Sequence, residues 1–381
     1  MAAIITGVGV VSSLGADPVS FAKGLRGGRS GCALHDFEYL GGRKVSAPAY
    51  LAMPADAKGL IDPKKLRRMD RLSRMCAVSA RQALAMAGID ASTLNPARTG
   101  VVFGTAFGAM ATTQAFVDSW LKQGERHASP LNFMNSVHGI MASLIALDLG
   151  ITGVNLTLSQ RDLSFEGALV TALEILESGE ADTLIVGAGD ELTPLLHDFG
   201  ARVHYVNLDA ANARGLDPFA PTDPTVPGDG AAVIVLERAD SKRKPLAKFE
   251  AAAMGRLGKT DLAAKLLSSD LRSIISLATT NRGGSKRAAA HFARRENALD
   301  GLLGRELVKL THRGNFGDSP SAGALQCVAN VLMLSGGEVF APLAAGEIRR
   351  DLVAGVAAPT AILHDAASVS GTHAAYVLTQ A

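Results

Sequence analysis

Residues 166–180, EGALVTALEILESGE, decide the fold, because residues 322–338 repeat their pattern as AGALQCVANVLMLSGGE. Both stretches begin near Gly-Ala-Leu, continue as an apolar helix, and close with Ser-Gly and an acidic residue, with spacings that differ by one residue. This repeat indicates a chain built from two similar halves. Residues 238–246, RADSKRKPL, are polar and contain a proline, as linkers do. We therefore predict lobes at residues 1–240 and 247–381.

Strand-like and helix-like segments alternate around the first of these two helices. Short apolar or β-branched runs occupy residues 4–11, 101–104, 154–158, 183–186 and 231–236. Helical apolar spacing covers residues 70–87, 136–149 and 163–176, each followed closely by a glycine that suits a helix C-terminus. This alternation predicts an α/β protein with a buried mixed sheet.

The composition is that of a globular protein with a large core. Of the 381 residues, 48% are hydrophobic, 19% are charged and 40 are glycine, which predicts buried sheet, close helix packing and many tight turns. The length exceeds what one small core needs and agrees with two lobes. The formal net charge of +2 gives no electrostatic reason to expect nucleic acid or an anionic membrane as a partner.

Cysteine usage and the length of apolar runs indicate the cellular setting. Cys32, Cys76 and Cys327 lie far apart without CxxC or histidine-rich spacing, which argues against disulfides and structural zinc. Residues 1–15, MAAIITGVGVVSSLG, have no basic start and contain glycines, so we expect a first strand and not a signal peptide. No apolar run reaches the roughly 18 residues that span a bilayer. We expect a soluble cytoplasmic protein without metal or cofactor.

A set of short motifs carries a family resemblance through its order along the chain. The motifs are residues 5–12 (ITGVGVVS), 70–71 (DR), 98–102 (RTGVV), 187–191 (GAGDE), 217–219 (DPF), 228–231 (GDGA), 236–237 (LE) and 371–374 (GTHA). In this order they resemble the β-ketoacyl synthase family over nearly the whole chain, with residues 247–310 matching least. The resemblance implies a thiolase-like, five-layered αβαβα fold built from two similar halves, and a dimer.

The resemblance also locates the position of the family's nucleophile, a cysteine at a helix N-terminus where the dipole lowers the thiol pKa. Residues 179–182, GEAD, are similar to the turn that follows the family's nucleophile helix, and counting back from them reaches Asp162. A carboxylate cannot replace the thiolate, because an acyl-aspartate is a reactive anhydride, uphill from a thioester. We expect Asp162 to cap the following helix; a catalytic role is the alternative.

The two histidine positions of the family are also changed. The second histidine follows a lysine and a glycine, which correspond here to Arg313, Gly317 and, in place of the histidine, Asp318. Arginine keeps the charge but not the point-donor geometry of lysine, and aspartate removes the donor that stabilises an enolate. The first histidine belongs to a His-Gly-Thr motif, whose nearest match, residues 278–283 (ATTNRG), places Asn281 near that position.

The family's glycine-rich gating loop departs as well, since residues 368–371 read SVSG where the family has Gly-Phe-Gly-Gly. Val369 is therefore a candidate for lining the tunnel or the interface. Phe133, Met134 and Met141 could line an acyl tunnel, although such spacing is usual for core residues. His138 follows a segment that the family places near the tunnel and dimer interface, and we interpret it as a satisfied interface histidine.

Other conspicuous residues have ordinary explanations. We interpret His312 as a surface or strand histidine, because it lies six residues from the required position. Cys76 and Cys327 fall on apolar helix faces and are expected in the core. The basic run at residues 64–74, KKLRRMDRLSR, could dock an acidic carrier protein or form a solvated helix face.

These substitutions favour a non-condensing subunit that resembles a chain-length factor and pairs with an active ketosynthase in polyketide, polyene or fatty-acid-like synthesis. Gln160 lies two residues before the position where the best-known chain-length factors carry glutamine. One alternative is altered chemistry on the same fold, such as malonyl decarboxylation or acyl transfer. Another is a non-catalytic homodimer that binds an acyl carrier protein. The expected partners are an active ketosynthase or a second copy, and an acyl carrier protein, without nucleic acid or membrane.

Overall fold

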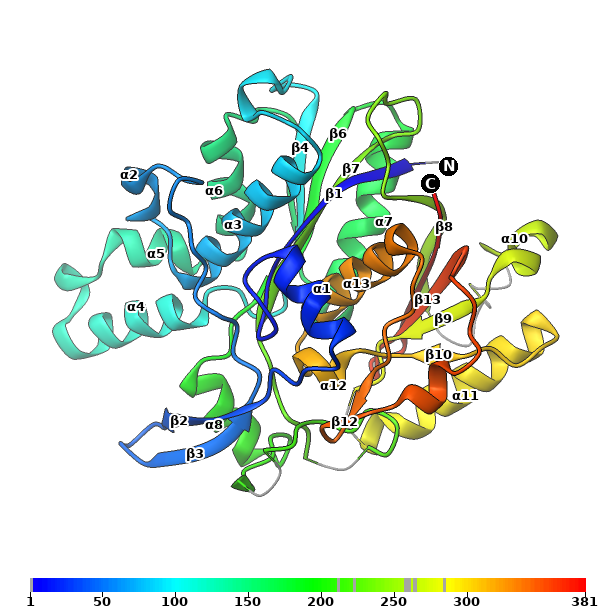
Figure 1. The fold of residues 1–381 in the computed structure, drawn as a ribbon. Coiled ribbons are helices and arrows are strands. Elements are labelled where there is room, and N and C mark those ends of the chain that lie inside the picture. The colour runs from blue at the N-terminus through cyan, green and yellow to red at the C-terminus, as the bar shows by residue number, and fades with distance from the viewer. Residues whose placement is uncertain (1–2, 211–212, 222–223, 257–261, 263–265, 284–285) are drawn as a thin grey trace.

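One mixed sheet of ten strands runs through the molecule in this computed structural model, which describes residues 3–210, 213–221, 224–256, 262, 266–283 and 286–381. In spatial order the strands are β10 (Lys309–Leu310), β9 (Leu277–Thr280), β13 (Ala361–Ala367), β14 (Thr372–Thr379), β8 (Ala247–Arg256), β1 (Ala3–Val11), β7 (Gly230–Arg238), β6 (Thr183–Asp190), β4 (Thr99–Gly104) and β5 (Asn155–Leu158). Figure 1 shows the sheet curving through the centre of the chain.

The sheet consists of two halves with the same topology. Outward from the centre, the first half runs β1-β7-β6-β4-β5 and the second runs β8-β14-β13-β9-β10. In each half the first three strands are antiparallel and the last two are parallel to the third. β1 and β8 join the halves by antiparallel pairing of residues 3–5 with residues 247–249. The predicted construction from two similar halves is confirmed.

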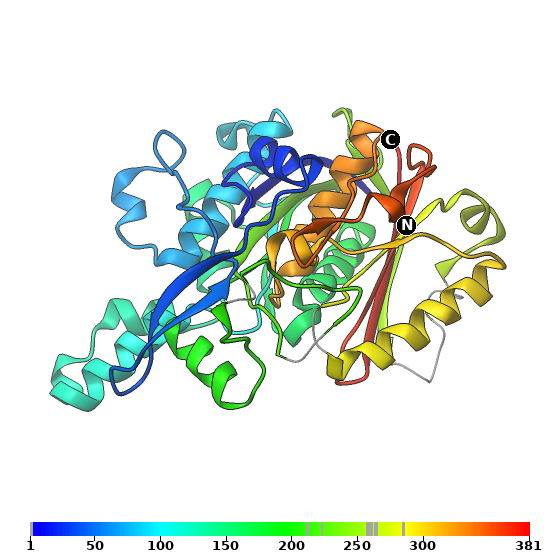
Figure 2. The ribbon, with the colours of Figure 1, turned by 60° about the horizontal axis from the view of Figure 1, so that its bottom comes forward.

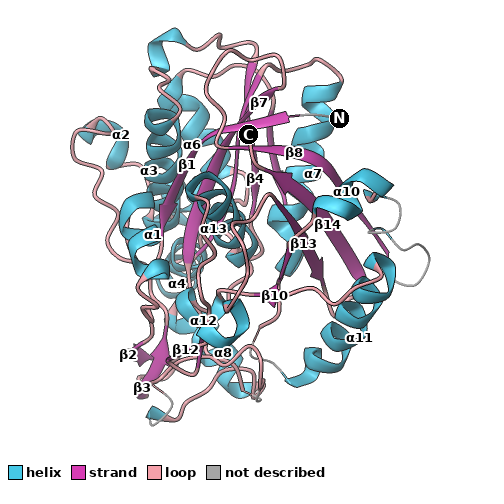
Figure 3. Cartoon of the chain, turned by 45° about the vertical axis from the view of Figure 1, so that its right-hand side comes forward, coloured by secondary structure: helices cyan, strands magenta, loops and turns pink. Residues whose placement is uncertain are grey.

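The two helices of the internal repeat form the middle layer. α7 (Ser164–Glu177) and α13 (Ala322–Gly336) pack against each other and against both halves of the sheet, and their apolar residues belong to one core cluster. Both helices are apolar on nearly every face, as a helix buried on all sides must be. Figures 1 and 3 show them between the two halves of the sheet.

Two outer helix layers complete the five-layered arrangement. α3 (Arg71–Met86) and α6 (Ile140–Leu149) cover the outer face of the first half, and α10 (Ser269–Ile274) and α11 (Lys286–Leu303) cover the second. The expected thiolase-like fold is therefore the observed one. Among the described residues, no helix is long and apolar enough to cross a membrane.

Glycine in β1 lets α3 approach the sheet closely. A Cβ atom on Gly9 would lie 1.9 Å from the carbonyl oxygen of Ser79, and one on Gly7 would lie 2.0 Å from that of Ala83. Both oxygens belong to the α3 backbone, which cannot move aside as a flexible side chain could. The ITGVGVVS motif is thus needed for the packing of α3 on β1.

Further elements surround this framework. They include α1 (Pro18–Arg26), β2 (Ala33–Glu38), β3 (Lys44–Ala49), α2 (Pro63–Leu66), α4 (Met110–Gln123), α5 (Pro130–Ser136), the 3₁₀ turn η3 (Arg161–Leu163), α8 (Pro194–Arg202), α12 (Arg313–Phe316), β11 (Leu343–Ala344) and β12 (Glu347–Ile348). In Figure 2, α4, α5 and the β2–β3 hairpin extend away from the layered body.

Element boundaries differ from the sequence prediction in one place that matters. The helix expected at residues 136–149 begins four residues later, since α6 begins at Ile140 and Ser136 is the last residue of α5. Val137 lies between them with an extended backbone, φ −79° and ψ 141°, which interrupts the helix. β7 ends at Arg238 and β8 begins at Ala247, but the division into lobes at this stretch stays a prediction.

Candidate functional site

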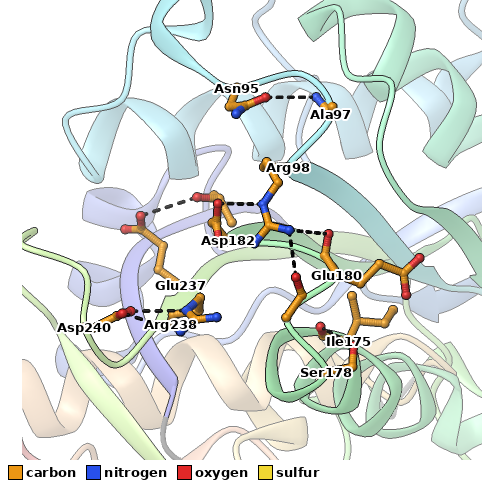
Figure 4. Close-up of polar contacts among 12 residues, drawn as sticks. Asn95, Ala97, Arg98, Ile175, Ser178, Glu180, Asp182, Glu237, Arg238 and Asp240 are labelled. Carbon is orange, nitrogen blue, oxygen red and sulfur yellow. Dashed lines mark hydrogen bonds and ion pairs between the residues drawn. The ribbon is translucent and has the colours of Figure 1, made fainter.

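Hydrogen bonds from Arg98 hold the turn at residues 179–182, from which the position of the family's nucleophile was located. Arg98, from the RTGVV motif, donates from Nη1 to the Gly179 carbonyl at 2.7 Å and from Nε to Asp182 at 2.9 Å. Figure 4 shows this guanidinium between the end of α7 and the start of β6. From this turn α7 runs back without a break to Ser164, and Asp162 lies in the 3₁₀ turn η3 directly before that helix.

The three positions that the resemblance selected lie together. Ser368, in the turn between β13 and β14, donates to Asp162 Oδ1 at 2.7 Å. Asn281, just beyond β9, bonds the backbone of Ala367, the neighbour of Ser368. A Cβ atom on Gly283 would lie 2.7 Å from Asp318 Oδ2, so the segment after β9 also touches Asp318. One site therefore gathers the ends of β9 and β13 and the starts of α7 and α13.

Asp162 does not cap α7, so that prediction is wrong. It lies inside the 3₁₀ turn η3, two residues before α7 begins at Ser164, and the N-cap residue Leu163 makes no side-chain capping hydrogen bond. Arg161 has φ +56°, in the left-handed region that favours glycine, so the chain turns sharply there. The carboxylate consequently reaches Ser368 in place of the helix amides. Burial raises the pKa of Asp162, while the Ser368 hydrogen bond and the Arg313 charge oppose that rise.

Asn281 has a structural role, because its side chain joins the ends of two strands. Its Nδ2 donates to the Ala367 carbonyl at 3.1 Å, and its Oδ1 accepts from the Ala367 amide at 3.0 Å. The side chain is buried, with only 4% of its surface exposed. An amide has no proton to exchange near neutral pH, so this residue holds the ends of β9 and β13 together and cannot act as an acid or base.

Asp318 and Arg313 form a buried ion pair. Arg313 Nη1 donates to Asp318 Oδ1, while Tyr205 and Thr225 donate their hydroxyls to Oδ2, each at 3.3 Å. The Asp318 charge raises the pKa of Tyr205, so this phenol stays protonated and remains a donor. Arg313 Nη2 is buried and has no hydrogen-bond partner in the structure. The cluster thus holds one unused cationic donor.

His312 is completely buried, and its interpretation as a surface or strand histidine is wrong. Its Nε2 donates to the Phe340 carbonyl at 3.0 Å, and its Nδ1 accepts from Gln326 Nε2 at 3.0 Å. Gln326 Oε1 accepts from the His312 amide, which fixes the amide orientation and hence the neutral tautomer. Burial also lowers the pKa of His312. Both ring nitrogens are engaged, so the imidazole has no free position for catalysis.

A chain of buried polar side chains continues inward from His312. Gln326 bonds Asn330, Asn330 bonds Thr279, and Thr279 bonds His364, each at 2.9–3.0 Å. His364 Nε2 lies 3.5 Å from Glu166 Oε1. Although carboxylate, imidazole and hydroxyl follow one another here, His364 is fully buried and Glu166 is 1% exposed, so no substrate reaches them. The chain links α7, β13, β9 and α13.

None of the three cysteines is an activated thiolate. Cys76 in α3 and Cys327 in α13 are fully buried, as predicted for core residues, and burial raises the pKa of both, Cys327 to about 12. Burial also raises the pKa of Cys32, to about 11. A nucleophilic cysteine needs the opposite shift.

The predicted tunnel and interface residues do not all belong to this site. Val369 does, because it follows Ser368, and it is 69% exposed. Phe133 and Met134 lie on α5 and are 58% and 44% exposed, so their interpretation as core residues is wrong for the single chain, whereas Met141 is fully buried. His138 is exposed beside Gly108 and has no hydrogen bond among the described contacts, so it is not satisfied within the chain.

Part of the basic run at residues 64–74 forms ion pairs within the first half of the chain. Lys65 and Arg81 pair with buried Asp148, and Arg71 pairs with buried Asp229. The remaining cations of residues 64–74 lie on the exposed turns around α2 and the start of α3. In the part of the chain that is described, no three His, Cys, Asp or Glu side chains are grouped to hold a metal ion.

Sequence reasoning missed Ser368, Tyr205 and Thr225 as members of the site. Ser368 lies in the loop that was singled out, and its replacement of glycine by a hydroxyl was the available signal. Tyr205 and Thr225 lie in a long irregular stretch between α8 and β7, where no motif pointed to them.

The fold and the site define the class of protein: a thiolase-like α/β protein whose site lies where its two halves meet. A solved structure described as the ishigamide ketosynthase/chain length factor superposes over 100% of this chain and 99% of its own, with a TM-score of 0.84 and 20% identity. A type II polyketide ketosynthase in complex with its acyl carrier protein superposes equally completely, with a TM-score of 0.79 and 17% identity.

The family follows from the sequence comparisons. The family profile "Beta-ketoacyl synthase, N-terminal domain" matches residues 3–242, and this chain belongs to the β-ketoacyl synthase family. The chloroplastic 3-oxoacyl-acyl-carrier-protein synthase I of Arabidopsis thaliana is 28% identical over 66% of the chain and 54% of its own length. The actinorhodin polyketide putative beta-ketoacyl synthase 1 of Streptomyces coelicolor is 30% identical over 66% and 56%. The matches thus span little more than half of these relatives.

Proposed function

We propose that this chain is a non-condensing subunit of the chain-length-factor type, which pairs with an active ketosynthase and contacts its acyl carrier protein. One observation carries the proposal: Asp162, Asn281 and Asp318 meet in one site, at positions where the resemblance implies a cysteine and two histidines. None of these three side chains supplies a nucleophile that forms a stable thioester, and none supplies an imidazole.

The chemistry of condensation explains why these replacements matter. The acyl group must leave a carrier thioester for a nucleophile of similar leaving ability, which a thiolate provides and a carboxylate does not. Decarboxylation then needs donors at the developing enolate. Here Asn281 is committed to the Ala367 backbone, and Asp318 accepts hydrogen bonds from three side chains. The site is polar and well connected, but it lacks the thiolate and the two imidazoles that the resemblance implies for these steps.

An exposed apolar surface on α4 and α5 supports a protein partner. Trp120 and Leu121 on α4 are 50% and 73% exposed, and Leu131, Phe133 and Met134 on α5 are 41–58% exposed. No residue of α4 is buried. Large contiguous apolar surfaces on a single chain mark interaction sites. Two solved structures with this fold are described as a ketosynthase/chain length factor and as a ketosynthase in complex with its acyl carrier protein, which are the kinds of partner proposed here.

Co-expression with the cysteine-containing ketosynthases of the same organism tests the proposal. We expect a stable heterodimer in size-exclusion chromatography, and condensing activity that requires both chains. Phe133→Asp should abolish co-elution, whereas Val19→Asp, at an equally exposed apolar position on α1, should leave it intact. A homodimer that ignores every ketosynthase would refute the pairing.

A further inference from the structure

We propose that the free edge of β5 and the groove beside it bind a strand of the ketosynthase partner that carries lysine or arginine, and that Glu174 and Glu180 exclude a second copy of this chain. The inference rests on the proposed function, because the partner it describes is the other subunit of that pair. It adds a contact surface to the one on α4 and α5, and it names the side chains that select the partner by charge.

The first support is the free edge of β5. This strand lies at one end of the ten-stranded sheet, and among the described strands only β4 pairs with it. The Val154 and Leu158 carbonyls accept hydrogen bonds from the β4 side, at 2.8 and 3.1 Å. Because backbone groups alternate in direction along a strand, those of Asn155 and Thr157 point away from β4. These amides and carbonyls are available to pair with another strand.

The second support is a groove of about 490 Å³ between β5 and α7. Val154, Leu156 and Ile175 contribute apolar lining, and Leu156 is 42% exposed. Among the described residues that line the groove, Glu174 and Glu180 are the charged ones, and both are exposed carboxylates. The groove therefore suits a paired strand whose side chains are apolar and cationic.

The third support is that these two carboxylates have no cation to balance them within the described part of the chain. Arg98 and Arg238, which lie near the end of α7, are each paired with an aspartate. Figure 4 shows the Glu180 carboxylate directed away from Arg98. The last turn of α7 also has no basic residue, although the negative end of the helix dipole favours one there. Cations of a partner would supply the missing charge.

A second copy of this chain brings the wrong charge to the groove. Two copies that pair at β5 are related by a twofold axis, so each groove faces the same groove of the other copy. Glu174 and Glu180 then meet their own counterparts and are repelled. The β5 sequence, Asn-Leu-Thr-Leu, brings no cation to offset this repulsion.

Sedimentation velocity of the purified full-length chain tests the exclusion of a second copy. Glu174→Lys/Glu180→Lys reverses the charge of the groove. At about 50 mM salt, a mixture of this variant with the unchanged chain should associate at least about tenfold more tightly than either protein alone, and about 0.5 M salt should remove most of the difference. Equal association of the mixture and of the unchanged chain alone would overturn the inference.

Two controls locate the effect at β5. Glu306→Lys/Glu347→Lys makes the same charge change at exposed positions outside the groove, and its mixture with the unchanged chain should gain nothing. Thr157→Pro, added to the charge-reversed chain, removes an outward amide and should abolish the gain. Thr157→Val keeps that amide and should retain the gain. A gain that persists in Thr157→Pro, or that occurs in the control mixture, would contradict pairing at β5.

The ketosynthase that co-elutes with this chain tests the choice of partner. Glu174→Lys/Glu180→Lys should weaken its binding by about tenfold or more, whereas Glu306→Lys/Glu347→Lys should change it by less than about twofold. Unchanged binding of the charge-reversed chain would refute the basic partner strand. If no ketosynthase co-elutes, the proposed function fails, and the mixing experiment still decides whether Glu174 and Glu180 exclude self-pairing, because it needs this chain alone.

Discussion

Arg313 and its neighbours show how one site can keep the positions of its family and lose the chemistry. Asp162 is bound by Ser368, Asn281 by the Ala367 backbone, and Asp318 by Arg313, so the substituted side chains stabilise one another. The replacements follow from their spacing to the motifs that carry the family resemblance. The partners of these residues do not, because Ser368 lies 206 positions from Asp162 and only the fold brings them together. The burial of His312 was not predicted for the same reason, because burial depends on the tertiary structure.

At the residue scale, Asp229 of the GDGA motif should be critical for stability. It is fully buried, accepts from the Ala52 and Leu192 amides at 2.5 and 3.1 Å, and pairs with Arg71 at 2.7 Å. Asp229→Ala leaves these donors without an acceptor and should lower the free energy of unfolding by about 3 kcal/mol. Urea denaturation measures this. Asp240→Ala, at an exposed pair with Arg238, should cost less than about 0.5 kcal/mol; similar losses in both variants would contradict the account.

Glu191 should make stability depend on pH. It is 3% exposed, and burial raises its pKa from 4.5 to about 7. Because the folded state holds the proton more tightly than the unfolded state, this carboxyl contributes stability below pH 4.5 that is lost as the pH rises through about 7. The loss is about 3 kcal/mol.

Denaturant titrations across this pH range test the prediction. Glu191→Gln keeps an oxygen for the Ala111 amide, which Glu191 Oε1 now accepts at 2.8 Å, and it should flatten the pH profile. Buried Asp190, with its pKa raised to about 6, should leave a smaller dependence of the same sign. The exposed Glu347→Gln is the matched control and should leave the slope unchanged. An unaltered slope in Glu191→Gln would exclude this carboxyl as the source.

At the scale of elements, some helix ends lie where the local sequence predicts them, and others do not. α3 begins after Asp70, which accepts from the Ser73 amide, and α6 ends at Gly150 in the left-handed conformation, both as their residue types predict. The start of α6 was misplaced by four residues, because Val137 has an extended backbone and α6 begins only at Ile140. The start of α7 was misplaced by one residue, and that single residue moved Asp162 from a cap into a 3₁₀ turn.

Gly150 should be needed for the end of α6. Its φ is +71°, and no atom lies within 4 Å of the place where a Cβ would stand, so only the backbone conformation opposes a side chain. Gly150→Ala should therefore lower the free energy of unfolding by about 1 kcal/mol. Gly139→Ala, at the other end of α6 with φ −75° and equally open space, should change it by less than about 0.5 kcal/mol. Thermal or urea unfolding of the two variants compares them, and equal effects would contradict this explanation.

At the scale of the whole molecule, the repeated helix pattern was sufficient to predict two similar halves. The observed strand orders show why, since each half contributes one apolar helix to the layer between the two halves of the sheet, and α7 and α13 are those helices. The joining of both halves into one sheet through β1 and β8 could not be predicted, because strand pairing leaves no mark in the local pattern. On the exposed surface of α4 and α5, Phe133 and Met134 were candidates for the tunnel or the interface, whereas Trp120, Leu121 and Leu131 gave no signal in the sequence.

The central claim is that this chain forms no acyl-enzyme at residue 162. Intact-mass spectrometry tests it most directly, after the purified chain is incubated with an active ketosynthase and an acyl-loaded carrier protein. We predict an unmodified mass for this chain and an acyl adduct on the ketosynthase alone. An acyl adduct on this chain that maps to Asp162, and disappears in Asp162→Ala, would contradict the account.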